Sequence, residues 1–556
     1  MIATAGQIAL AAALFASLAS ASPAAAKAKA SPTLSIPYSR HTPSTAPNLR
    51  LLPLEALDHV WDDKTVPSLG DDDAADDGTT NSTSLATRSL IAGEEALAAR
   101  HLFAEDFADG SSIRVRSFDA HDKEQVVKRS HVAAPVENAA LLAKRRRQIR
   151  AACLDSTATD VTISSLFYYG GANTTVYLCQ SATIATTGPI FFTAANQVLT
   201  TYGNPTGATR ATIRVTGSDQ ACAIYGVQAG ADRAILRNVQ VDGARPALGR
   251  SSEGLALIEM GGNTQGQQIT SIRAYEPRGW TALHTAEGTN LVCSGMLVSG
   301  NQIGPAGQPP PTNNQFPDDA SWADGISHAC KSSQVLNNLI TDVTDGGIVI
   351  FGAPGSLVQG NTINSVSRQL LGGINMVDWS PFSGSFEGTV VQGNNLLANT
   401  AFMKIGIAIG GLSWGGDNRT EARTYGGTVQ NNYILAGTTG GGYMEFGISV
   451  AGHRDAVIKG NSAKRGRFGG TDTSYCFPDT YPLPPPGPFV RDPYTTPGVT
   501  VSPASAWYQE RAIVFAICRG PGPVTVYGSA VKRDGLDEFD PLEARNAPDI
   551  FDGIFV

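Results

Sequence analysis

The stretch VQGNTI at residues 358–363 decides the fold, because its pattern of an apolar residue, two further residues, an asparagine, one residue and an apolar residue recurs along the chain. The other copies are VSGNQI (298–303), VLNNLI (335–340), VQGNNL (391–396), VQNNYI (429–434), IKGNSA (458–463) and a weaker ILRNVQ (235–240). Successive asparagines from Asn301 to Asn461 are 37, 23, 33, 38 and 29 residues apart. A fixed motif at a variable spacing indicates constant strands joined by loops of variable length.

A second unit consists of glycine, an apolar residue, any residue and another apolar residue. Its copies are GISH (325–328), GIVI (347–350), GINM (373–376), GIAI (406–409) and GISV (447–450). Alternate side chains of a strand point to opposite faces, so stacked strands of this kind give a solenoid with a continuous inner core. We therefore predict an all-β fold, a single-stranded right-handed parallel β-helix. A propeller or a sandwich would not explain single strands separated by coil-length loops.

The recurring asparagine has a physical role in this prediction. We expect it to lie at a bend between strands, to tolerate left-handed backbone geometry there, and to hydrogen-bond to backbone groups. Stacked asparagines could also hydrogen-bond to one another from coil to coil.

Composition excludes several classes of protein. The chain has 556 residues, of which 60 are glycine, and only five of these glycines precede Gln148. Charged residues make up 16% of the chain, against roughly 25% in typical soluble domains. A coiled coil or helical bundle is therefore excluded for residues 148–556. The formal net charge of -8 gives no support for a nucleic-acid partner, which would require a basic face.

Residues 1–21 have the features of a secretory signal peptide. An apolar run at 8–18 is followed by Ala19, Ser20 and Ala21, a small-residue cleavage pattern. The run is too short to span a membrane. We expect a secreted, extracellular protein without a membrane segment; the alternative is a buried N-terminal helix.

Residues 22–147 form the predicted pro-segment, largely disordered. They contain an acidic cluster at 71–77 and a glycosylation sequon at Asn81, and they end on KRRR at 144–147. Paired basic residues resemble sites that secretory proteases cut; the alternative is a basic linker that is never cut. Residues 148–556 then form the β-helix domain, with YPLPPPGP (481–488) as a proline-rich C-terminal strap. We expect a monomer.

All seven cysteines lie in the predicted β-helix domain. Pairing of neighbours would give Cys153–Cys179, Cys293–Cys330 and Cys476–Cys518 and leave Cys222 free, although spacing alone leaves the connectivity open. The sequence has no CxxC motif or Cys/His cluster, and we expect no metal.

The Asn units resemble those of pectin-lyase-like β-helix proteins, over about residues 160–461. The run WADGISHAC (322–330), continued by TDGGIVIFG (344–352), is similar to fungal secreted β-helix proteins. The resemblance implies the fold but does not carry an activity.

Asp324 and Asp345 are the predicted catalytic pair. Alignment of the glycine units places Asp324 in register with Gly346, with Asp345 one residue earlier on the next coil. Since neighbouring strands are about 4.8 Å apart and residues about 3.3 Å apart, the two Cα atoms should be about 6 Å apart. Carboxyl groups at this spacing suit a glycosidase, and their pKa values would be pushed apart. The alternative is that both aspartates cap turns.

The pair is distantly similar to polygalacturonases, whose motifs are Asn-Thr-Asp, Asp-Asp and Gly-His-Gly. Asp324 takes the place of the aspartate in the first motif, and Asp345 that of the first aspartate in the second. Gly346 replaces the second aspartate, and no histidine lies near Ser367, where the third motif would fall. The resemblance therefore does not imply cleavage of polygalacturonan by that mechanism.

Further residues are predicted to bind substrate. Asp378 and Trp379 would supply a carboxylate and a stacking platform for a sugar, while Lys404 would hold an acidic sugar. Glu259 and His284 share an outward-facing column and would extend the cleft. His328 falls in the inward column and is expected to be structural, and a surface salt bridge is the alternative for Lys404.

The function predicted from the sequence is that of a secreted polysaccharide-active enzyme, a glycoside hydrolase with paired aspartates. One alternative is a polysaccharide lyase or epimerase that uses a base such as Lys404. Another is a non-catalytic carbohydrate-binding protein of the cell wall. The hydrolase needs no cofactor, and Ca²⁺ enters only under the lyase alternative.

Overall fold

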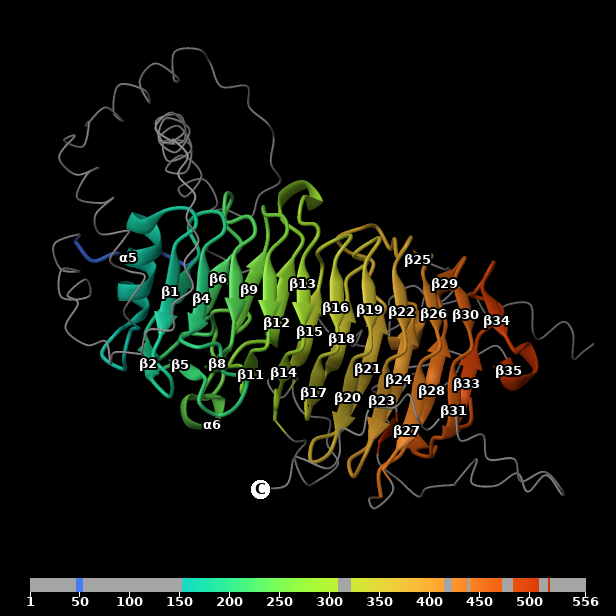
Figure 1. Cartoon of the computed structure of the whole chain (residues 1–556). Helices are drawn as coiled ribbons and strands as arrows, with labels where there is room; N and C mark the ends of the chain where they lie inside the picture. The colour runs from blue at the N-terminus through green and yellow to red at the C-terminus, as the bar shows by residue number, and fades with distance from the viewer. Residues whose placement is uncertain are drawn as a thin grey trace, which may run out of the picture. The chain divides into compact units, whose positions relative to one another are not determined.

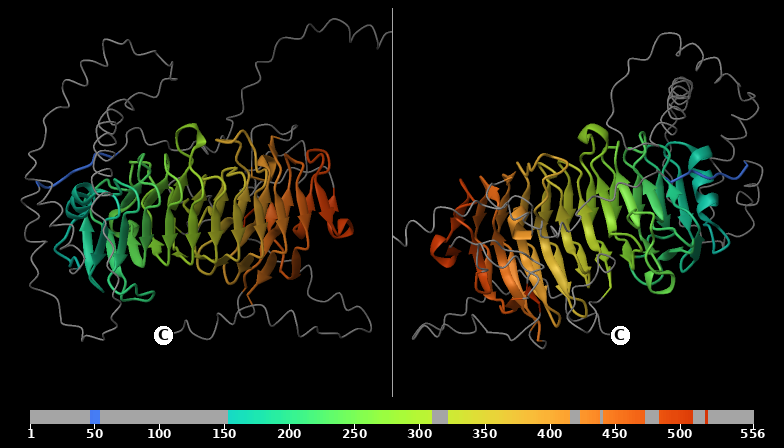
Figure 2. Two further views of the ribbon diagram at one scale, coloured as in Figure 1. Left: turned by 45° about the horizontal axis from the view of Figure 1, so that its top comes forward. Right: turned by 180° about the vertical axis from the view of Figure 1, so that it is seen from behind.

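The computed structural model describes residues 47–53, 153–308, 322–414, 423–437, 441–472, 484–509 and 519–520. The chain winds as a right-handed parallel β-helix, which confirms the predicted fold. The coils contribute strands to three parallel sheets, here named A, B and C, and the last described coil has no strand in sheet B (Figure 1). The coils stack one on the next along a single axis in all three views (Figure 2).

Sheet A has 11 strands, each paired with the strand three places on in the chain until the last coils. They are β1 (Thr175–Leu178), β4 (Val198–Thr201), β7 (Ile235–Arg237), β10 (Gln268–Thr270), β13 (Leu297–Ser299), β16 (Gln334–Leu336), β19 (Leu357–Gln359), β22 (Val390–Gln392), β26 (Thr428–Gln430), β30 (Val457–Lys459) and β34 (Thr500–Ser502).

Sheet B has 10 strands and follows sheet A in each coil. They are β2 (Thr183–Thr186), β5 (Ala211–Val215), β8 (Val239–Asp242), β11 (Arg273–Tyr275), β14 (Gln302–Ile303), β17 (Leu339–Thr341), β20 (Thr362–Ser365), β23 (Asn395–Ala398), β27 (Tyr433–Ala436) and β31 (Ser462–Arg465).

Sheet C has 11 strands and contains the glycine units. They are β3 (Ile190–Phe191), β6 (Ile224–Gly226), β9 (Ile258–Gly261), β12 (Thr281–Ala286), β15 (Asp324–His328), β18 (Gly346–Ile350), β21 (Leu370–Met376), β24 (Met403–Ile409), β28 (Met444–Val450), β33 (Gly487–Arg491) and β35 (Tyr508–Gln509).

Few other elements accompany the sheets in the described chain. Two small sheets pair β25 (Thr424–Tyr425) with β29 (His453–Arg454), and β32 (Thr471–Asp472) with β36 (Arg519–Gly520). The helices are α5 (Asp160–Gly170), α6 (Arg245–Leu248) and α7 (Gly411–Trp414), with 3-10 turns η2 (Thr289–Leu291) and η3 (Ala504–Ala506).

The core is one continuous cluster of inward-facing apolar side chains. In sheet C, Ile326 pairs with Ile348 and Ile348 with Ile374, and all three are fully buried. The same row continues through Ile407 and Ile448. The predicted inner row is therefore confirmed, and it fixes the register that places the outward side chains.

The predicted stack of asparagines is confirmed as a ladder. Asn361 donates from Nδ2 to Oδ1 of Asn394 at 2.9 Å, and its own Oδ1 accepts from Nδ2 of Asn338 at 2.9 Å. The same bond links each neighbouring pair from Asn301 to Asn461. Each amide also donates to a backbone carbonyl, so these buried polar groups are satisfied.

One detail of that prediction is wrong. The left-handed conformation belongs to the residue before each ladder asparagine, for example Gly360 (φ 67) and Asn337 (φ 53). The weak copy is also offset, since Leu236 pairs with Ile269 and Ile269 with Val298. Asn238 therefore lies one residue before the ladder position and itself adopts φ 50.

Helix α5 covers the first coil. Thr159 caps it, and its buried side chains, which include Ile163 and Phe167, pack on the core. Residues 47–53, from the predicted pro-segment, dock on this helix: Arg50 pairs with Asp160 at 2.7 Å, and the Leu52 N–H donates to Ser165 Oγ at 2.7 Å. The predicted signal peptide, the rest of the pro-segment and residues 481–483 of the proline-rich strap lie outside the described residues.

Two of the three expected disulfides are confirmed, Cys153–Cys179 and Cys293–Cys330. Cys222 is a free, buried cysteine, as expected. The third predicted pair, Cys476 and Cys518, lies outside the described residues. No helix in the described part of the chain has the length and apolarity needed to cross a membrane.

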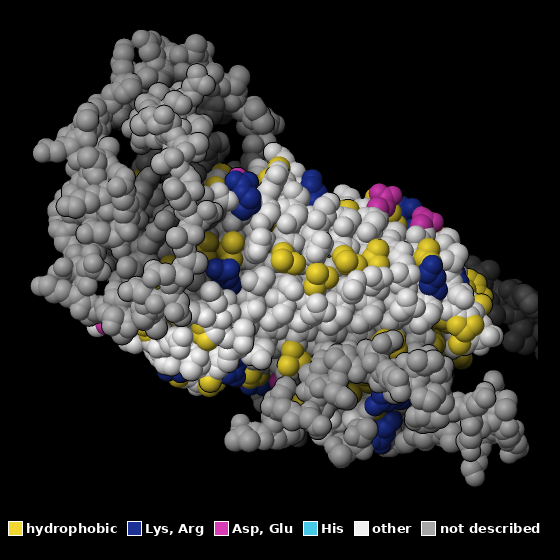
Figure 3. All heavy atoms as spheres, viewed as in Figure 1, with side chains coloured by type: hydrophobic (Ala, Val, Ile, Leu, Met, Phe, Trp, Pro, Cys, Tyr) yellow, Lys and Arg dark blue, Asp and Glu magenta, His cyan; other side chains and the backbone are white. Residues whose placement is uncertain are grey.

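The low charge of the sequence is visible on the surface. The face seen in Figure 3 consists mostly of uncharged side chains and backbone, with a row of hydrophobic side chains across it and few charged ones. A carboxylate or a basic group on a strand of this protein is thus uncommon, and those on sheet C form the candidate site.

Candidate active site on sheet C

The outward face of sheet C carries a line of side chains from neighbouring coils. Each of these residues follows the inward isoleucine or leucine of its strand. In register order from one strand to the next they are Glu259, His284, Ser327, Val349, Asn375, Ala408 and Ser449. Polar residues at this position have no role in the apolar core, so they are candidates for function.

Asp324 opens β15 beside this line. The predicted register is confirmed, because Ile326 pairs with Ile348 and Asp324 therefore lies opposite Gly346. The Gly346 N–H donates to Asp324 Oδ1 at 2.8 Å, and Ser327 Oγ hydrogen-bonds to Oδ2 at 2.9 Å. Only 2% of Asp324 is exposed. The carboxyl group thus forms the floor of the site and is held at both oxygens.

Asp345 and Asp378 lie near enough to Asp324 to act on its charge. Burial is the largest cause that raises the pKa of Asp324 well above its ordinary value, and the Asp345 carboxylate is the next. Asp378 adds a smaller effect in the same direction, while the bonds from Gly346 and Ser327 oppose it. Asp345 and Asp378 are half-buried, whereas Asp324 is buried.

Ser327 links Asp324 to a second hydroxyl. Its Oγ lies 3.0 Å from Thr281 Oγ1 as well as 2.9 Å from Asp324 Oδ2. A hydroxyl has one proton to donate, so it cannot donate in both directions at once. Its single proton is thus shared between the Asp324 carboxyl group and Thr281 Oγ1 on β12.

Glu259 and His284 form a second group, on β9 and β12. His284 Nδ1 lies 2.8 Å from Glu259 Oε2, and Glu259 Oε1 accepts from the Ala256 N–H at 2.8 Å. The Trp280 ring packs edge-on against the imidazole at 5.0 Å between centroids. His284 lies opposite Ser327 on the neighbouring strand β15, and Glu259 lies one strand further from Asp324. The pair extends the site along the solenoid axis.

Lys404 is not at the surface, contrary to the surface salt bridge considered from the sequence. It is fully buried on β24 and lies opposite the fully buried Glu445 on β28, since Met403 pairs with Met444. Burial lowers the pKa of Lys404 to about 7, against the opposing charge of Glu445. Lys404 is three strands from Asp324, about 14 Å along the stack.

Two other residues singled out from the sequence have clear positions. Trp379, which follows Asp378, is 49% exposed. His328 is fully buried as expected, between Thr285 Oγ1 at 2.7 Å and Ser356 Oγ at 3.2 Å, and burial lowers its pKa to about 3.

Sequence reasoning missed Asn375 and Ser449. Both are fully buried on the outward line, and neither the amide of Asn375 nor the hydroxyl of Ser449 has a hydrogen-bond partner among the described residues. The signal was present, because both occupy the third position of a glycine unit, GINM and GISV. Lone polar residues there could not be told from surface residues without the burial.

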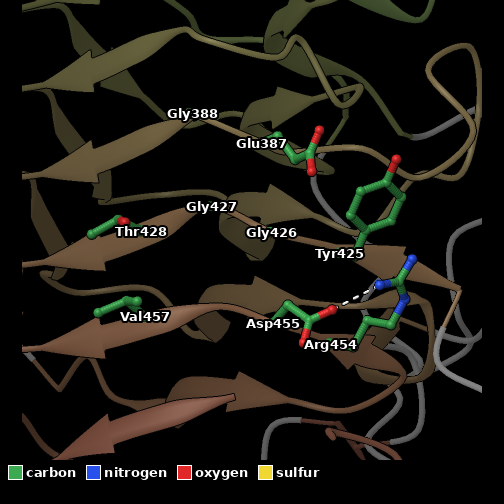
Figure 4. Close-up of a pocket in the computed structure, with 9 residues that line it drawn as sticks. All are labelled: Glu387, Gly388, Tyr425, Gly426, Gly427, Thr428, Arg454, Asp455 and Val457. Atoms are coloured by element: carbon green, nitrogen blue, oxygen red, sulfur yellow. Dashed lines mark hydrogen bonds and ion pairs between the residues drawn. The ribbon is translucent and has the colours of Figure 1, made fainter. Parts of the chain in front are cut away.

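A surface hollow of about 490 Å³ lies elsewhere, where the coils pass from sheet C to sheet A (Figure 4). Gly426 and Gly427 line the hollow, and the Arg454 guanidinium lies 4.3 Å from the centre of the Tyr425 ring. Arg454 is also paired with Asp455 at 2.7 Å. Its basic group is already matched and none of the predicted site residues lines the hollow, so the candidate site remains on sheet C.

The described residues contain no group of three His, Cys, Asp or Glu side chains placed to hold a metal ion. Asp324, Asp345 and Asp378 interact electrostatically without converging on one point. The arrangement is therefore suited to proton transfer between carboxyl groups.

No protein-family model and no curated protein matches the chain. Among solved structures, the A-module of mannuronan C-5 epimerase AlgE6 from Azotobacter vinelandii is similar at 13% identity and TM-score 0.34, over 64% of this chain and 99% of that one. The catalytic unit of a GH87 alpha-1,3-glucanase from Streptomyces thermodiastaticus is similar at 12% identity and TM-score 0.35, over 65% and 72%. An exopolygalacturonase from Thermotoga maritima is similar at 13% identity and TM-score 0.29, over 57% and 87%. These similarities assign no activity and no residue role to this chain.

Proposed function

We propose that the protein is a polysaccharide-active enzyme, a glycoside hydrolase in which Asp324 and Asp345 act as acid and base. The observation that carries the proposal is the state of Asp324. Burial and two neighbouring carboxylates raise its pKa well above the ordinary value. A carboxyl group whose pKa is raised, beside two half-buried carboxyl groups, is suited to the acid role in cleavage of a glycosidic bond.

In the proposed reaction, Asp324 gives its proton to the leaving glycosidic oxygen as the bond from that oxygen to the anomeric carbon breaks. A water molecule attacks the anomeric carbon and gives its proton to Asp345. Asp378 adds negative charge beside the positive charge that develops on the sugar ring.

Secretion belongs to the same proposal. The two disulfides suit an oxidising compartment, where polysaccharides outside the cell are the substrate. We propose an extracellular enzyme that acts as a monomer.

One observation favours a second function, that of a lyase or epimerase. Lys404 has its pKa lowered to about 7, so its amine would be available as a base near neutral pH. Its burial and its position opposite Glu445 weigh against it, because a base must reach a sugar carbon.

The experiment is an assay of the full chain on a panel of neutral and acidic glycans, scored for new reducing ends and for unsaturated-uronate absorbance. The hydrolase proposal expects reducing ends alone, and losses of at least about a hundredfold in Asp324→Asn and Asp345→Asn. Asp342→Asn is the matched control, because Asp342, also between β17 and β18, accepts bonds from the N–H groups of Val366 and Ser367. Unsaturated products together with reducing ends would favour the lyase, and unchanged cleavage in both variants would refute the aspartate pair.

A further inference from the structure

Asn375 is positioned to bind a ligand next to Asp324. If a Cβ were placed on Gly346, Asn375 Nδ2 would lie 2.9 Å from it and Asp324 Oδ1 3.0 Å from it. The carboxamide of Asn375 and the carboxyl group of Asp324 therefore flank the bare backbone of Gly346.

The hydrogen-bonding capacity of Asn375 is unused by the described protein. The side chain is fully buried, and neither Oδ1 nor Nδ2 has a hydrogen-bond partner among the described residues. Ser449 repeats this state two strands further on, with only the small Ala408 between them in register. Buried polar groups without partners are rare in native proteins and call for an explanation. A carboxamide and a hydroxyl group can both hydrogen-bond to the hydroxyl groups of a sugar.

The charges of this face exclude an acidic sugar. The basic residues on the described sheet C strands are His284, paired with Glu259; Lys404, opposite Glu445; the buried His328; and Arg491, which donates to Thr496. None of them hydrogen-bonds to Asn375 or Ser449. Three carboxyl groups, those of Asp324, Asp345 and Asp378, lie at the near end of the row. A uronate carboxylate would meet this cluster of acidic groups without a basic partner.

We infer that Asn375 and Ser449 form a subsite for an uncharged sugar, so that the substrate is a neutral glycan. This inference rests on the proposed function and names its substrate class. The Asn375 amide binds ring hydroxyls, and Ser449 binds the hydroxyls of the adjoining part of the chain.

Trp414 sets the condition for access. A Cβ on Gly372 would lie 2.7 Å from Trp414 Cζ3 and still closer to Asn375 Oδ1, so the indole lies against the carboxamide. Trp414 is 6% exposed at the end of α7, a helix of one turn that contacts β24 and β28. A sugar can reach Asn375 only if the indole edge leaves its place against the carboxamide.

The test measures binding by calorimetry in an Asp324→Asn background, which removes the transferable proton yet keeps the site's charge as in the protonated acid. The probes are soluble neutral glycans (β-glucan, xylan and galactomannan) and the uronate glycans polygalacturonate and alginate. We expect at least one neutral glycan to bind and both uronates to bind at least about tenfold more weakly. Tighter binding of a uronate, or no binding of any neutral glycan, would overturn the inference.

Asn375→Ala should weaken neutral-glycan binding about tenfold or more while leaving the melting temperature unchanged. Asn361→Ala is the matched control, since this ladder amide bonds to Asn338, Asn394 and Val335. It should lower the melting temperature and leave the affinity unchanged. Unchanged affinity in Asn375→Ala would overturn the inference, and so would a melting temperature lowered without any loss of binding.

Trp414→Ala removes the cover and should tighten neutral-glycan binding; weaker binding would overturn the proposed access. The outcomes separate the inference from the hydrolase proposal. Cleavage of a glycan together with normal binding by Asn375→Ala refutes the inference alone. Lost binding in Asn375→Ala without cleavage of any glycan by the native chain refutes the hydrolase alone.

Discussion

Asp324 and Asn375 flank the backbone of Gly346, with Asp324 Oδ1 and Asn375 Nδ2 each about 3 Å from where a Cβ would stand. Gly346 is thus required by the site rather than by backbone conformation, since it is not among the glycines with positive φ. A carboxyl group of raised pKa and an amide without hydrogen-bond partners among the described residues lie on either side of this glycine.

A side chain at Gly346 should damage both the site and the fold. In Gly346→Ala the new methyl group would press on Asp324, Asn375 and the Val349 side chain, so we expect a loss of about 1–3 kcal/mol in stability and a large loss of activity. Gly207→Ala is the control, because nothing lies within 4 Å of its Cβ position. Thermal unfolding and glycan cleavage check both variants. Full activity in Gly346→Ala would refute the close contact.

Asp324→Asn should stabilise the protein at neutral pH while it abolishes activity. The pKa of Asp324 is raised in the folded chain, so between about pH 4 and that raised value the folded state binds one proton more than the unfolded state. Stability from this group is therefore present below about pH 4 and is lost as the pH rises through that window, by about 1.4 kcal/mol for each pH unit. Denaturation of both proteins from pH 4 to 8 should show a difference in the free energy of unfolding that grows with pH. A difference that stays constant with pH would argue against the raised pKa of Asp324.

Removing one charge of the Lys404 and Glu445 pair should destabilise the protein, whereas replacing both residues by apolar ones should change its stability little. Lys404→Met leaves Glu445 buried without its opposite charge, which should cost about 3–5 kcal/mol, whereas Lys404→Met with Glu445→Leu should be close to the native stability. Chemical denaturation of the single and double variants measures both values. A double variant as unstable as the single one would argue against the pairing of the two charges.

The pH dependence of the same pair has the opposite sign to that of Asp324. The pKa of Lys404 is lowered to about 7, so the unfolded chain binds one proton more between pH 7 and about 10. This group alone makes the native chain gain stability with rising pH over that window. Chemical denaturation should show the gain in the native chain and its absence in the double variant.

The disulfide Cys293–Cys330 should contribute about 4 kcal/mol, because it closes a loop with a sequence separation of 37. Replacing both cysteines by alanine should lower the denaturation midpoint by a corresponding amount. Cys222→Ala is the control, since Cys222 is free, and it should lose only the packing of one buried sulfur. Equal effects in the two variants would argue against the bond.

The repeats predicted the fold because each unit carries two independent physical signals. Val358 and Ile363 mark inward positions, and Asn361 between them marks the corner where its amide can stack on Asn338 and Asn394. Local spacing is enough for this, since every coil repeats the same contacts. What spacing could not predict is which residue takes the left-handed conformation; Gly360, rather than Asn361, does so.

The site was less predictable because its chemistry depends on burial. The register of Asp324 opposite Gly346 followed from the glycine units. That Lys404 is fully buried beside Glu445 could not follow, since a lysine on an outward strand position is usually solvated. Asn375 is the same case: its lack of hydrogen-bond partners among the described residues depends on what packs over it.

The most direct test of the central claim is the infrared spectrum of the native chain minus that of Asp324→Asn at pH 7, in the region of the carboxylic-acid carbonyl stretch. If Asp324 is the acid, we expect a band from a protonated carboxylic acid that is present in the native chain and absent in the variant. This band should disappear as the pH is raised. A difference spectrum at pH 7 with only carboxylate bands would show that Asp324 is ionised, and it would contradict the assignment of this residue as the acid.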